Sequence, residues 1–395
     1  MRSVKITAVE VEVVRGRHPG LPEGVRQKQV RPLSLYPEHR PAQQQPAPPT
    51  PDALTARYLR IRTDGDVEGF YGPIEHDAAQ TIIDLLGPFL IGQDALAVTI
   101  AWDKLARSDR HARHGYLKMG ISAIDNALWD LRGKVYDAPV WQLLGGGSRD
   151  RIPAYVSTLG TSLEPAVVRT TATELQRAGF WGQKWFFADG PGDGQQGLTR
   201  SVGLARQLRD TLGEDYPIMF DAFHGWDLGF ARAWVERTRE LRPTWLEEPF
   251  GPDRLPAFID LHRSTGQALS TGEHLYDRAE VLPFLTEAAI AVLQCDPEWC
   301  GGVTELVRIC ALSDTFGVPV IPHGHGLHAA LHVVASQSPT TCPSVEYLIR
   351  IMPNRHHFEV APLVPENGSF ALPTGAGFGI ELDENKIDTW TTLTD

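Results

Sequence analysis

Three acidic side chains stand at the ends of short apolar runs in the second half of the sequence. They are Asp221, Glu247 in the pair Glu247-Glu248, and Glu273, each 26 residues after the one before. If these runs are neighbouring parallel strands, the three carboxylates meet at one edge, where each pair at about 4 Å repels by roughly 4 kcal/mol. A divalent cation removes that cost, and oxygen ligands with open positions suit Mg²⁺, with Mn²⁺ as a substitute. The sequence therefore predicts a magnesium site; the alternative is three loop acids that cap helices or bridge to arginines.

Two later runs end in Asp296 and in His323. A carboxylate beside an imidazole can bond one ring nitrogen, fix the tautomer and raise the basicity of the other nitrogen. His323 is therefore the predicted general base. The alternative is a hydrogen-bonded structural histidine. The nearby His325, His328 and His332 could also form a zinc-binding helix face, but the motif brings no cysteine or second acid.

Two further histidines follow the predicted metal ligands closely. His224 lies three positions after Asp221, and His274 follows Glu273 directly. Both are candidates for substrate binding at the rim of the pocket, and both could instead be helix-start residues that bond the backbone.

A barrel would position these residues together. From Ile152 onward, eight short apolar runs start 23 to 34 residues apart, and helical sequence follows the first seven. Eight such units close a parallel α/β barrel, whose active site gathers at the carboxyl ends of the strands. After the eighth run proline and glycine recur, which predicts a (β/α)7β barrel that ends on its last strand. The eight runs are IPAYVS, QKWFF, PIMFDA, TWLEEP, ALSTGEH, AVLQCDP, VPVIPHG and SVEYLI.

The N-terminal part reads as a separate α+β domain. Alternating residues predict strands over 1–14 and 56–71, and helical periodicity covers 77–90, 95–106 and 115–135. We expect domains at 1–135 and 136–370, with 371–395 returning to the first domain. The proline- and glutamine-rich segment 15–52, with His18 and His39, is either a surface linker or a loop that covers the substrate.

Composition narrows the class of protein. The net charge of −12 gives no basic face for nucleic acid. The four cysteines show no CxxC spacing, and no apolar stretch of about 18 residues could span a membrane. We expect a cytoplasmic enzyme with neither a nucleic-acid nor a membrane partner.

The motifs also carry a family resemblance. Asp221, LEEP at 246–249, TGEH at 271–274, the Asp296 and His323 pair, Glu346 and the stretch 120–146 resemble the mandelate racemase branch of the enolase superfamily. The phrases KWFF, DAFHGWD, GEH, WCGGVTE and IPHG are similar to the acid-sugar dehydratases of that branch, the L-rhamnonate dehydratases among them. The resemblance implies a modified TIM barrel with an N-terminal capping domain whose loop selects the substrate, a homo-oligomer, and Mg²⁺ chemistry through an enediolate.

Position by position, the resemblance assigns Asp221, Glu247 and Glu273 to the metal and the His323–Asp296 pair to the base. It assigns Glu346 to the substrate side of the enediolate. Lys184 matches the first lysine of a Lys-x-Lys motif that supports the substrate carboxylate, but Phe186 replaces the second lysine. With one base, removal of a β-hydroxyl to give a 2-keto-3-deoxy acid is favoured over racemisation.

Three other functions remain as alternatives. A racemase or epimerase on the same scaffold would exchange the proton at C2 without loss of water. A barrel metal-hydrolase would use His323 and His325 as an HxH pair, but such pairs normally stand at the first strand. A non-catalytic binder would have a broken position among the ligands or the base pair, and only the second lysine is missing.

Overall fold

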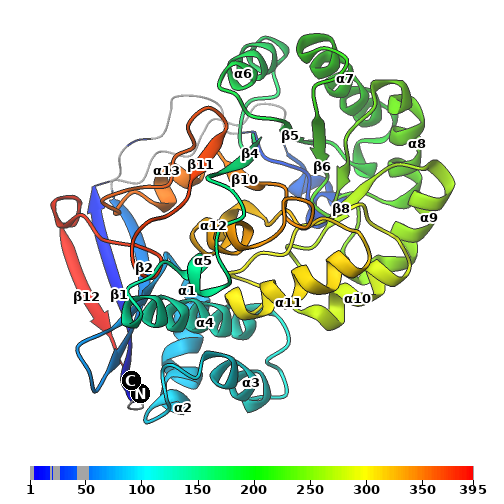
Figure 1. Ribbon diagram of the computed structural model, residues 1–395. Helices are drawn as coiled ribbons and strands as arrows, with labels where there is room; N and C mark the ends of the chain where they lie inside the picture. The colour runs from blue at the N-terminus through cyan, green and yellow to red at the C-terminus, as the bar shows by residue number, and fades with distance from the viewer. Residues whose placement is uncertain (1–3, 18–19, 21–26, 42–52, 395) are drawn as a thin grey trace.

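The computed structural model describes residues 4–17, 20, 27–41 and 53–394, and within them the eight predicted runs form a barrel (Figure 1). Parallel strands pair in the order β10-β4-β5-β6-β7-β8-β9. The seventh run follows β9 as a single parallel bridge between Leu293 and Val320. The strands are β4 (Arg151–Ser157), β5 (Gln183–Phe186), β6 (Ile218–Asp221), β7 (Leu246–Glu247), β8 (Leu269–Thr271), β9 (Val292–Leu293) and β10 (Val345–Leu348).

One helix connects each strand of the barrel to the next, and Figure 1 shows α6 to α11 around its outside. Helices cover the outer face of the strands and side chains fill the interior, which is why the strand sequences are almost continuously apolar. The predicted α/β class and the (β/α)7β barrel with a cap are confirmed. The helices are α6 (Pro165–Arg177), α7 (Gly194–Leu212), α8 (Leu228–Thr238), α9 (Leu255–Thr265), α10 (Arg278–Thr286), α11 (Gly302–Thr315) and α12 (Leu327–Ser336).

The capping domain is built on an antiparallel sheet of order β12-β1-β2-β3. Its strands are β1 (Ile6–Arg17), β2 (Ala53–Thr63), β3 (Gly69–Tyr71) and β12 (Thr389–Leu393), and its helices are α1 (His76–Thr81), α2 (Gly87–Leu90), α3 (Val98–Ser108) and α4 (Gly115–Val135). A π-helical segment, Ile82–Leu86, joins α1 to α2, so the predicted single helix over 77–90 has three parts. Pairing of β12 with β1 brings the C-terminal segment back to this sheet. The domain limits at 135 and 370 stay a prediction.

Helix α4 of the cap holds the first turn of α11 in the barrel. Ser122 Oγ accepts the Gly301 N–H at 2.8 Å, and Asp125 Oδ2 accepts the Thr304 N–H at 2.8 Å. These N–H groups have no partner within their own helix, so the cap supplies the missing acceptors. Gly302 has φ +81°, and a Cβ there would lie 2.4 Å from Asp125 Oδ2. The close approach of α4 therefore requires glycine at the start of α11.

The described part of the predicted covering loop divides in two: residues 15–17 extend β1, and segment 27–41 lies against the barrel. Val30 is buried, its N–H donates to Phe187 O at 2.7 Å, and its side chain packs so closely on Gly225 that a Cβ there would be 2.7 Å away. Segment 27–41, with its short turns Pro32–Leu35 and Pro37–His39, thus touches the ends of β5 and β6. His18 and residues 42–52 lie outside the described residues. The covering role of the loop stays a prediction.

Two further short helices and one short strand lie outside these two sets. α5 (Val140–Leu143) connects the cap to the barrel, α13 (Met352–Arg355) follows β10, and β11 (Ser369–Ala371) pairs antiparallel with β4. Within the described ranges, we find no helix of the length and apolarity needed to cross a membrane.

Candidate active site

The predicted functional residues occupy the carboxyl ends of successive barrel strands. Phe186 and Asp221 are partners in the β5–β6 register, and Asp221 and Glu247 are partners in the β6–β7 register. Glu273 lies two residues beyond β8, and His323 lies three beyond the Val320 bridge. Because the carboxyl ends of parallel strands meet at one mouth, this spacing brings the residues into one pocket floor.

Lys184 lies at the centre of the acidic residues. Its ammonium group is buried, forms a close ion pair with Glu247, and lies 2.8 Å from Glu346 Oε1 and 3.7 Å from Asp221 Oδ2. Burial lowers the pKa of Lys184, but Glu247 and Glu346 outweigh burial and hold it well above its usual range. The single positive charge of Lys184 is therefore shared by three carboxylates.

The negative charge of the three predicted metal ligands is only partly neutralised in this arrangement. Burial, opposed by Lys184, raises the pKa of Asp221 to about 6 and that of Glu247 to about 7. Burial, opposed by His323, also raises the pKa of Glu273. Raised carboxyl pKa values mark sites where negative charge is costly, and a divalent cation bound by hard oxygen ligands would lower that cost. The donor set of Asp221, Glu247 and Glu273 therefore fits Mg²⁺.

The three carboxylates point to partners within the protein in this structure. Glu247 is paired with Lys184 and accepts from Gln294 Nε2 at 2.7 Å, while Glu273 faces His323. Among the described residues, their oxygens do not gather within 4.8 Å of one another. Binding an ion would require the carboxylates to turn from these partners.

His323 and Asp296 form the predicted pair. His323 Nδ1 lies 2.8 Å from Asp296 Oδ2, and His323 Nε2 lies 3.2 Å from Glu273 Oε2. The Asp296 carboxylate is itself held by the N–H groups of Glu298 at 2.7 Å and Gly326 at 3.1 Å. Burial lowers the pKa of His323, but Glu273 and Asp296 outweigh it and raise the pKa to about 10. The arrangement directs Nε2 toward the acidic cluster.

Glu346 closes the cluster from β10. Its Oε2 accepts the Gly324 N–H at 3.0 Å, and its Oε1 faces Lys184. Burial raises the pKa of Glu346, but Lys184 and His323 outweigh burial, so the pKa lies below its usual range. Glu346 is therefore an anionic group between the lysine and the histidine.

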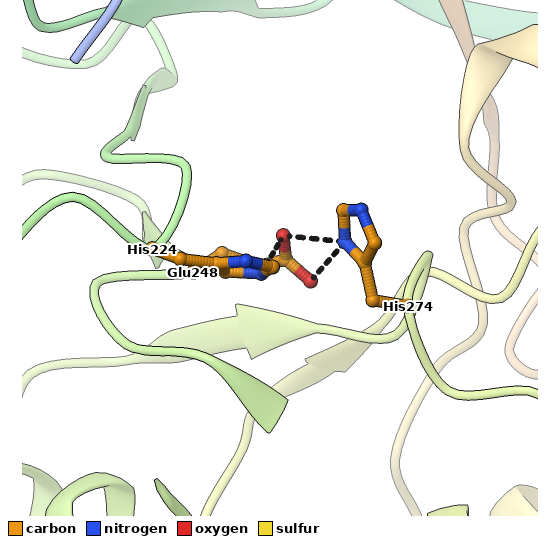
Figure 2. A group of neighbouring side chains, drawn as sticks. All are labelled: His224, Glu248 and His274. Carbon is orange, nitrogen blue, oxygen red and sulfur yellow. Dashed lines mark hydrogen bonds and ion pairs between the residues drawn. The ribbon is translucent and has the colours of Figure 1, made fainter. Parts of the chain in front are cut away.

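The two rim histidines meet at Glu248, a residue of the LEEP motif for which the sequence predicted no role. Figure 2 shows both imidazoles beside its carboxylate: His224 Nε2 is 2.6 Å and His274 Nδ1 is 3.1 Å from Glu248 Oε2. Burial opposes the charge of all three groups, yet the two imidazoles hold the pKa of Glu248 well below its usual range. Glu248 in turn raises the pKa of His224, and that of His274 to about 9.

The zinc alternative of His325, His328 and His332 does not assemble, and His325 lies in the turn before α12. His325 pairs with Glu298 at 3.2 Å, His328 pairs with Glu359 at 3.0 Å, and His332 Nδ1 accepts the Trp141 N–H at 3.1 Å. Each of the three histidines thus has its own hydrogen-bond partner, as structural histidines commonly do.

Three other residues at the site were not predicted from the sequence. Gln294 links Glu247 to the Tyr155 hydroxyl, and the Trp299 ring centroid lies 5.0 Å from that of His323. Gln294 precedes Asp296 by two, so strand alternation places both on one face and could have revealed it. Tyr155 lies within a barrel run that its sequence marks only as core, and Trp299 begins the phrase WCGGVTE, which carried the family resemblance but no role for the tryptophan.

The fold and the site together define a class: a capped α/β barrel whose acidic cluster, single lysine and His–Asp pair lie at the strand ends. The model of the "Enolase C-terminal domain-like" family matches residues 167–386, and that of the "Mandelate racemase / muconate lactonizing enzyme, N-terminal domain" matches residues 50–145. The chain therefore belongs to the mandelate racemase/muconate lactonizing enzyme family of the enolase superfamily.

Individual relatives give a finer comparison. An L-rhamnonate dehydratase of Saccharopolyspora erythraea is 31% identical, covering 89% of this chain and 88% of the relative. The rhamnonate dehydratase of Gibberella zeae, crystallised with Mg, has a TM-score of 0.84 at 26% identity, covering 98% of this chain and 97% of that one. These relatives and the family support an acid-sugar dehydratase, which is a hydro-lyase.

A third relative shows how far the fold alone reaches. The 3,6-anhydro-D-galactonate cycloisomerase of Zobellia galactanivorans has a TM-score of 0.78 at 25% identity, covering 98% of this chain and 100% of that one. Its name describes a different reaction from dehydration. The choice of reaction must therefore be argued from the residues of this chain.

Proposed function

We propose that the protein is a Mg²⁺-dependent aldonate dehydratase that removes the proton next to a carboxylate and expels the β-hydroxyl to give a 2-keto-3-deoxy acid. The observation that carries this proposal is a single, oriented base. His323 is bonded to Asp296 on one side and faces the acidic cluster on the other, while the buried side chain of Phe186 lies where a second lysine would act.

In the first step, His323 Nε2 accepts the α-proton of the substrate. Asp296 accepts a hydrogen bond from the Nδ1–H and stabilises the imidazolium once it forms. Glu273 is the group that raises the pKa of His323 most, so Nε2 would become free as the base once Glu273 turns from it to bind the ion. The electron pair of the broken C–H bond moves toward the substrate carboxylate, whose negative charge rises. Lys184 supplies a fixed positive charge for that developing enediolate.

Asp221, Glu247 and Glu273 would hold the Mg²⁺, which supplies a Lewis acid for the substrate oxygens. In the second step, the imidazolium of His323 returns its proton to the departing β-hydroxyl, which leaves as water. The resulting enol tautomerises to the keto acid. One residue thus acts first as base and then as acid, and atoms balance as one substrate to one keto acid and one water.

His224 and His274 remain candidates for substrate contacts at the rim, and Glu346 for the substrate side of the enediolate. In the structure, His224 Nε2 and His274 Nδ1 both face Glu248. A sugar hydroxyl would therefore bind the other nitrogen of each imidazole or displace the contact with Glu248. A cytoplasmic location and a homo-oligomer stay predictions, as does the absence of a nucleic-acid or membrane partner.

The test is a screen of aldonic and aldaric acids with purified protein and Mg²⁺, read by formation of 2-keto-3-deoxy acid. We expect one or a few acids to react, with activity lost in EDTA and in His323→Asn, whose amide can still donate to Asp296. Keto acid formed equally well by His323→Asn would contradict the assignment of the base.

An epimerase on the same scaffold is distinguished in D₂O. Deuterium incorporated at C2 of recovered substrate, with no keto acid from any library member, would replace the dehydratase proposal with epimerisation. Neither signal with any acid would favour a binding protein.

A further inference from the structure

The strand ends that carry the predicted Mg²⁺ ligands also carry a second set of ligand groups, one position or a few positions further along the chain. His224, Glu248 and His274 follow β6, β7 and β8, and their ligand atoms lie within 4.8 Å of one another (Figure 2). Two imidazoles and one carboxylate are softer than the three-carboxylate set, and they suit zinc and similar transition-metal ions better than magnesium.

We propose that His224, Glu248 and His274 form a second cation site that binds a borderline divalent ion of the Zn²⁺ class. The site stands on its own residues and does not rest on the proposed dehydration. Ligands about 2.0 to 2.2 Å from an ion lie roughly 2.9 to 3.4 Å apart. The contacts to Glu248 Oε2, 2.6 Å from His224 Nε2 and 3.1 Å from His274 Nδ1, require shifts of only a few tenths of an ångström.

The orientation of His224 favours a ligand over a hydrogen-bond donor. Its Nε2 is buried and close to Glu248 Oε2, yet among the described residues it has no hydrogen-bond partner, because the direction of that contact is wrong for an N–H donor. An imidazole nitrogen that is near a carboxylate oxygen but misaligned with it can share an ion with that oxygen.

The Glu248 carboxylate is held from behind. Thr271 Oγ1 donates to Glu248 Oε1 at 2.9 Å, which leaves Oε2 for the two histidines. Outer hydrogen bonds of this kind orient the first ligands of a metal ion and are part of most metal sites.

The backbone at the site is held in an unusual conformation. His224 has φ +58° and Glu248 has φ +39°, a region that residues other than glycine seldom adopt, and the His224 N–H donates to Glu248 O at 2.7 Å. Such conformations are energetically unfavourable and concentrate at functional sites. Here they direct both side chains to one point.

A second cluster of two histidines and a glutamate among the described residues provides the contrast. His328 and His356 both bond Glu359 in good hydrogen-bond geometry, and all three residues are buried. That cluster is closed. At the proposed site the side chains of His224 and His274 are 13% and 26% exposed, which leaves an entry path and open coordination positions.

The test measures binding without substrate, so it fails independently of the proposed function. Protein stripped with EDTA is saturated with a large excess of Mg²⁺ and titrated with Co²⁺, followed by calorimetry and by the d–d absorption of the bound ion. We expect one Co²⁺ per chain that Mg²⁺ does not displace and Zn²⁺ does. His224→Asn, in which asparagine tolerates the left-handed backbone, and Glu248→Gln should weaken binding at least about 10-fold.

Two variants separate this site from its neighbours. Asp221→Asn, which removes a predicted Mg²⁺ ligand, should keep the Mg²⁺-resistant equivalent, and His356→Asn, which alters the closed cluster, should keep it too. The proposal is overturned if no Mg²⁺-resistant Co²⁺ binds, if His224→Asn binds it unchanged, or if the equivalent disappears in His356→Asn alone. Circular dichroism of each variant establishes that it is folded.

Discussion

Lys184 partly neutralises the buried carboxylates at the mouth of the barrel. It is the buried cation that faces Glu247, Glu346 and Asp221, so its loss would leave buried carboxylates without a positive partner. We expect Lys184→Met to lower the free energy of unfolding in EDTA by about 3 kcal/mol, the usual cost of breaking a buried ion pair. Mg²⁺ should restore part of this loss, because a cation would replace the missing charge.

The activity of Lys184→Met should fall at least about 100-fold even with Mg²⁺, since a charge at the developing enediolate is removed. Urea unfolding with and without Mg²⁺ measures the stability, and the exposed Lys104→Met is the control. Equal stability of Lys184→Met and wild type in EDTA would show that the carboxylates do not depend on this lysine.

Asp296 fixes the direction of His323. Asp296→Asn would place either an amide oxygen or an amide N–H beside His323 Nδ1. The N–H groups of Glu298 and Gly326 already donate to the oxygens at this position. The wrong tautomer then competes, and we expect kcat on the substrate found in the screen to fall about 10³- to 10⁴-fold. KM should change little, because Asp296 acts through the histidine. A fall in kcat of less than 10-fold, in a variant with unchanged melting temperature, would assign the orientation of His323 to other contacts.

At this scale, the sequence reveals residue positions better than residue contacts. Strand ends and the 26-residue intervals predicted that Asp221, Glu247 and Glu273 lie at one mouth, and the structure places them there. The partners of Glu248 could not be predicted, because they depend on left-handed backbone at His224 and Glu248, which only a small share of residues other than glycine adopt.

At the scale of elements, the junction between α4 and α11 holds the cap on the barrel. Asp125 accepts the Thr304 N–H, and its carboxyl is fully buried. We expect Asp125→Ala to cost about 1 to 3 kcal/mol, because it leaves a helix N–H without an acceptor. Asp125→Asn keeps an acceptor oxygen and should cost less. Hydrogen exchange of the first turn of α11, compared in the two variants, measures the effect at its source.

Equal exchange rates in Asp125→Ala, Asp125→Asn and wild type would mean that α11 is held at its start by other contacts. Burial raises the pKa of Asp125 to about 7, so the comparison is made at one fixed pH.

The elements themselves were largely predictable. All eight barrel runs could be recognised as short apolar segments, because strands that are covered on both faces are almost continuously apolar. The helical period over 95–106 and 115–135 likewise predicted α3 and α4, with α3 observed a few residues later, at Val98–Ser108. Two features were not predictable. The π-helical turn at Ile82–Leu86 has an ordinary helical pattern, and the seventh strand is reduced to a bridge at Val320, although its sequence resembles the other strands. Both depend on how neighbouring elements pack.

At the scale of the whole molecule, His332 lies where three parts of the chain meet. It belongs to α12, accepts the Trp141 N–H from α5, and packs edge to face on Phe378 of the C-terminal segment. Burial, with a contribution from His328, lowers the pKa of His332 from 6.5 to about 3. The folded protein therefore keeps this imidazole neutral at pH values where the unfolded chain binds a proton.

The direction of the pH effect follows from that difference. Above pH 6.5 both states are neutral at His332 and stability is full; as pH falls from about 6.5 toward about 3, only the unfolded state gains the proton, and stability declines by up to about 1.4 kcal/mol per pH unit. His332→Asn keeps an acceptor oxygen for the Trp141 N–H and removes the titration. We expect its unfolding free energy to depend less steeply on pH between 6.5 and 4, by up to one proton. Urea unfolding at several pH values measures this slope, with the exposed His111→Asn as control, and a slope equal to that of wild type would place the acid sensitivity elsewhere.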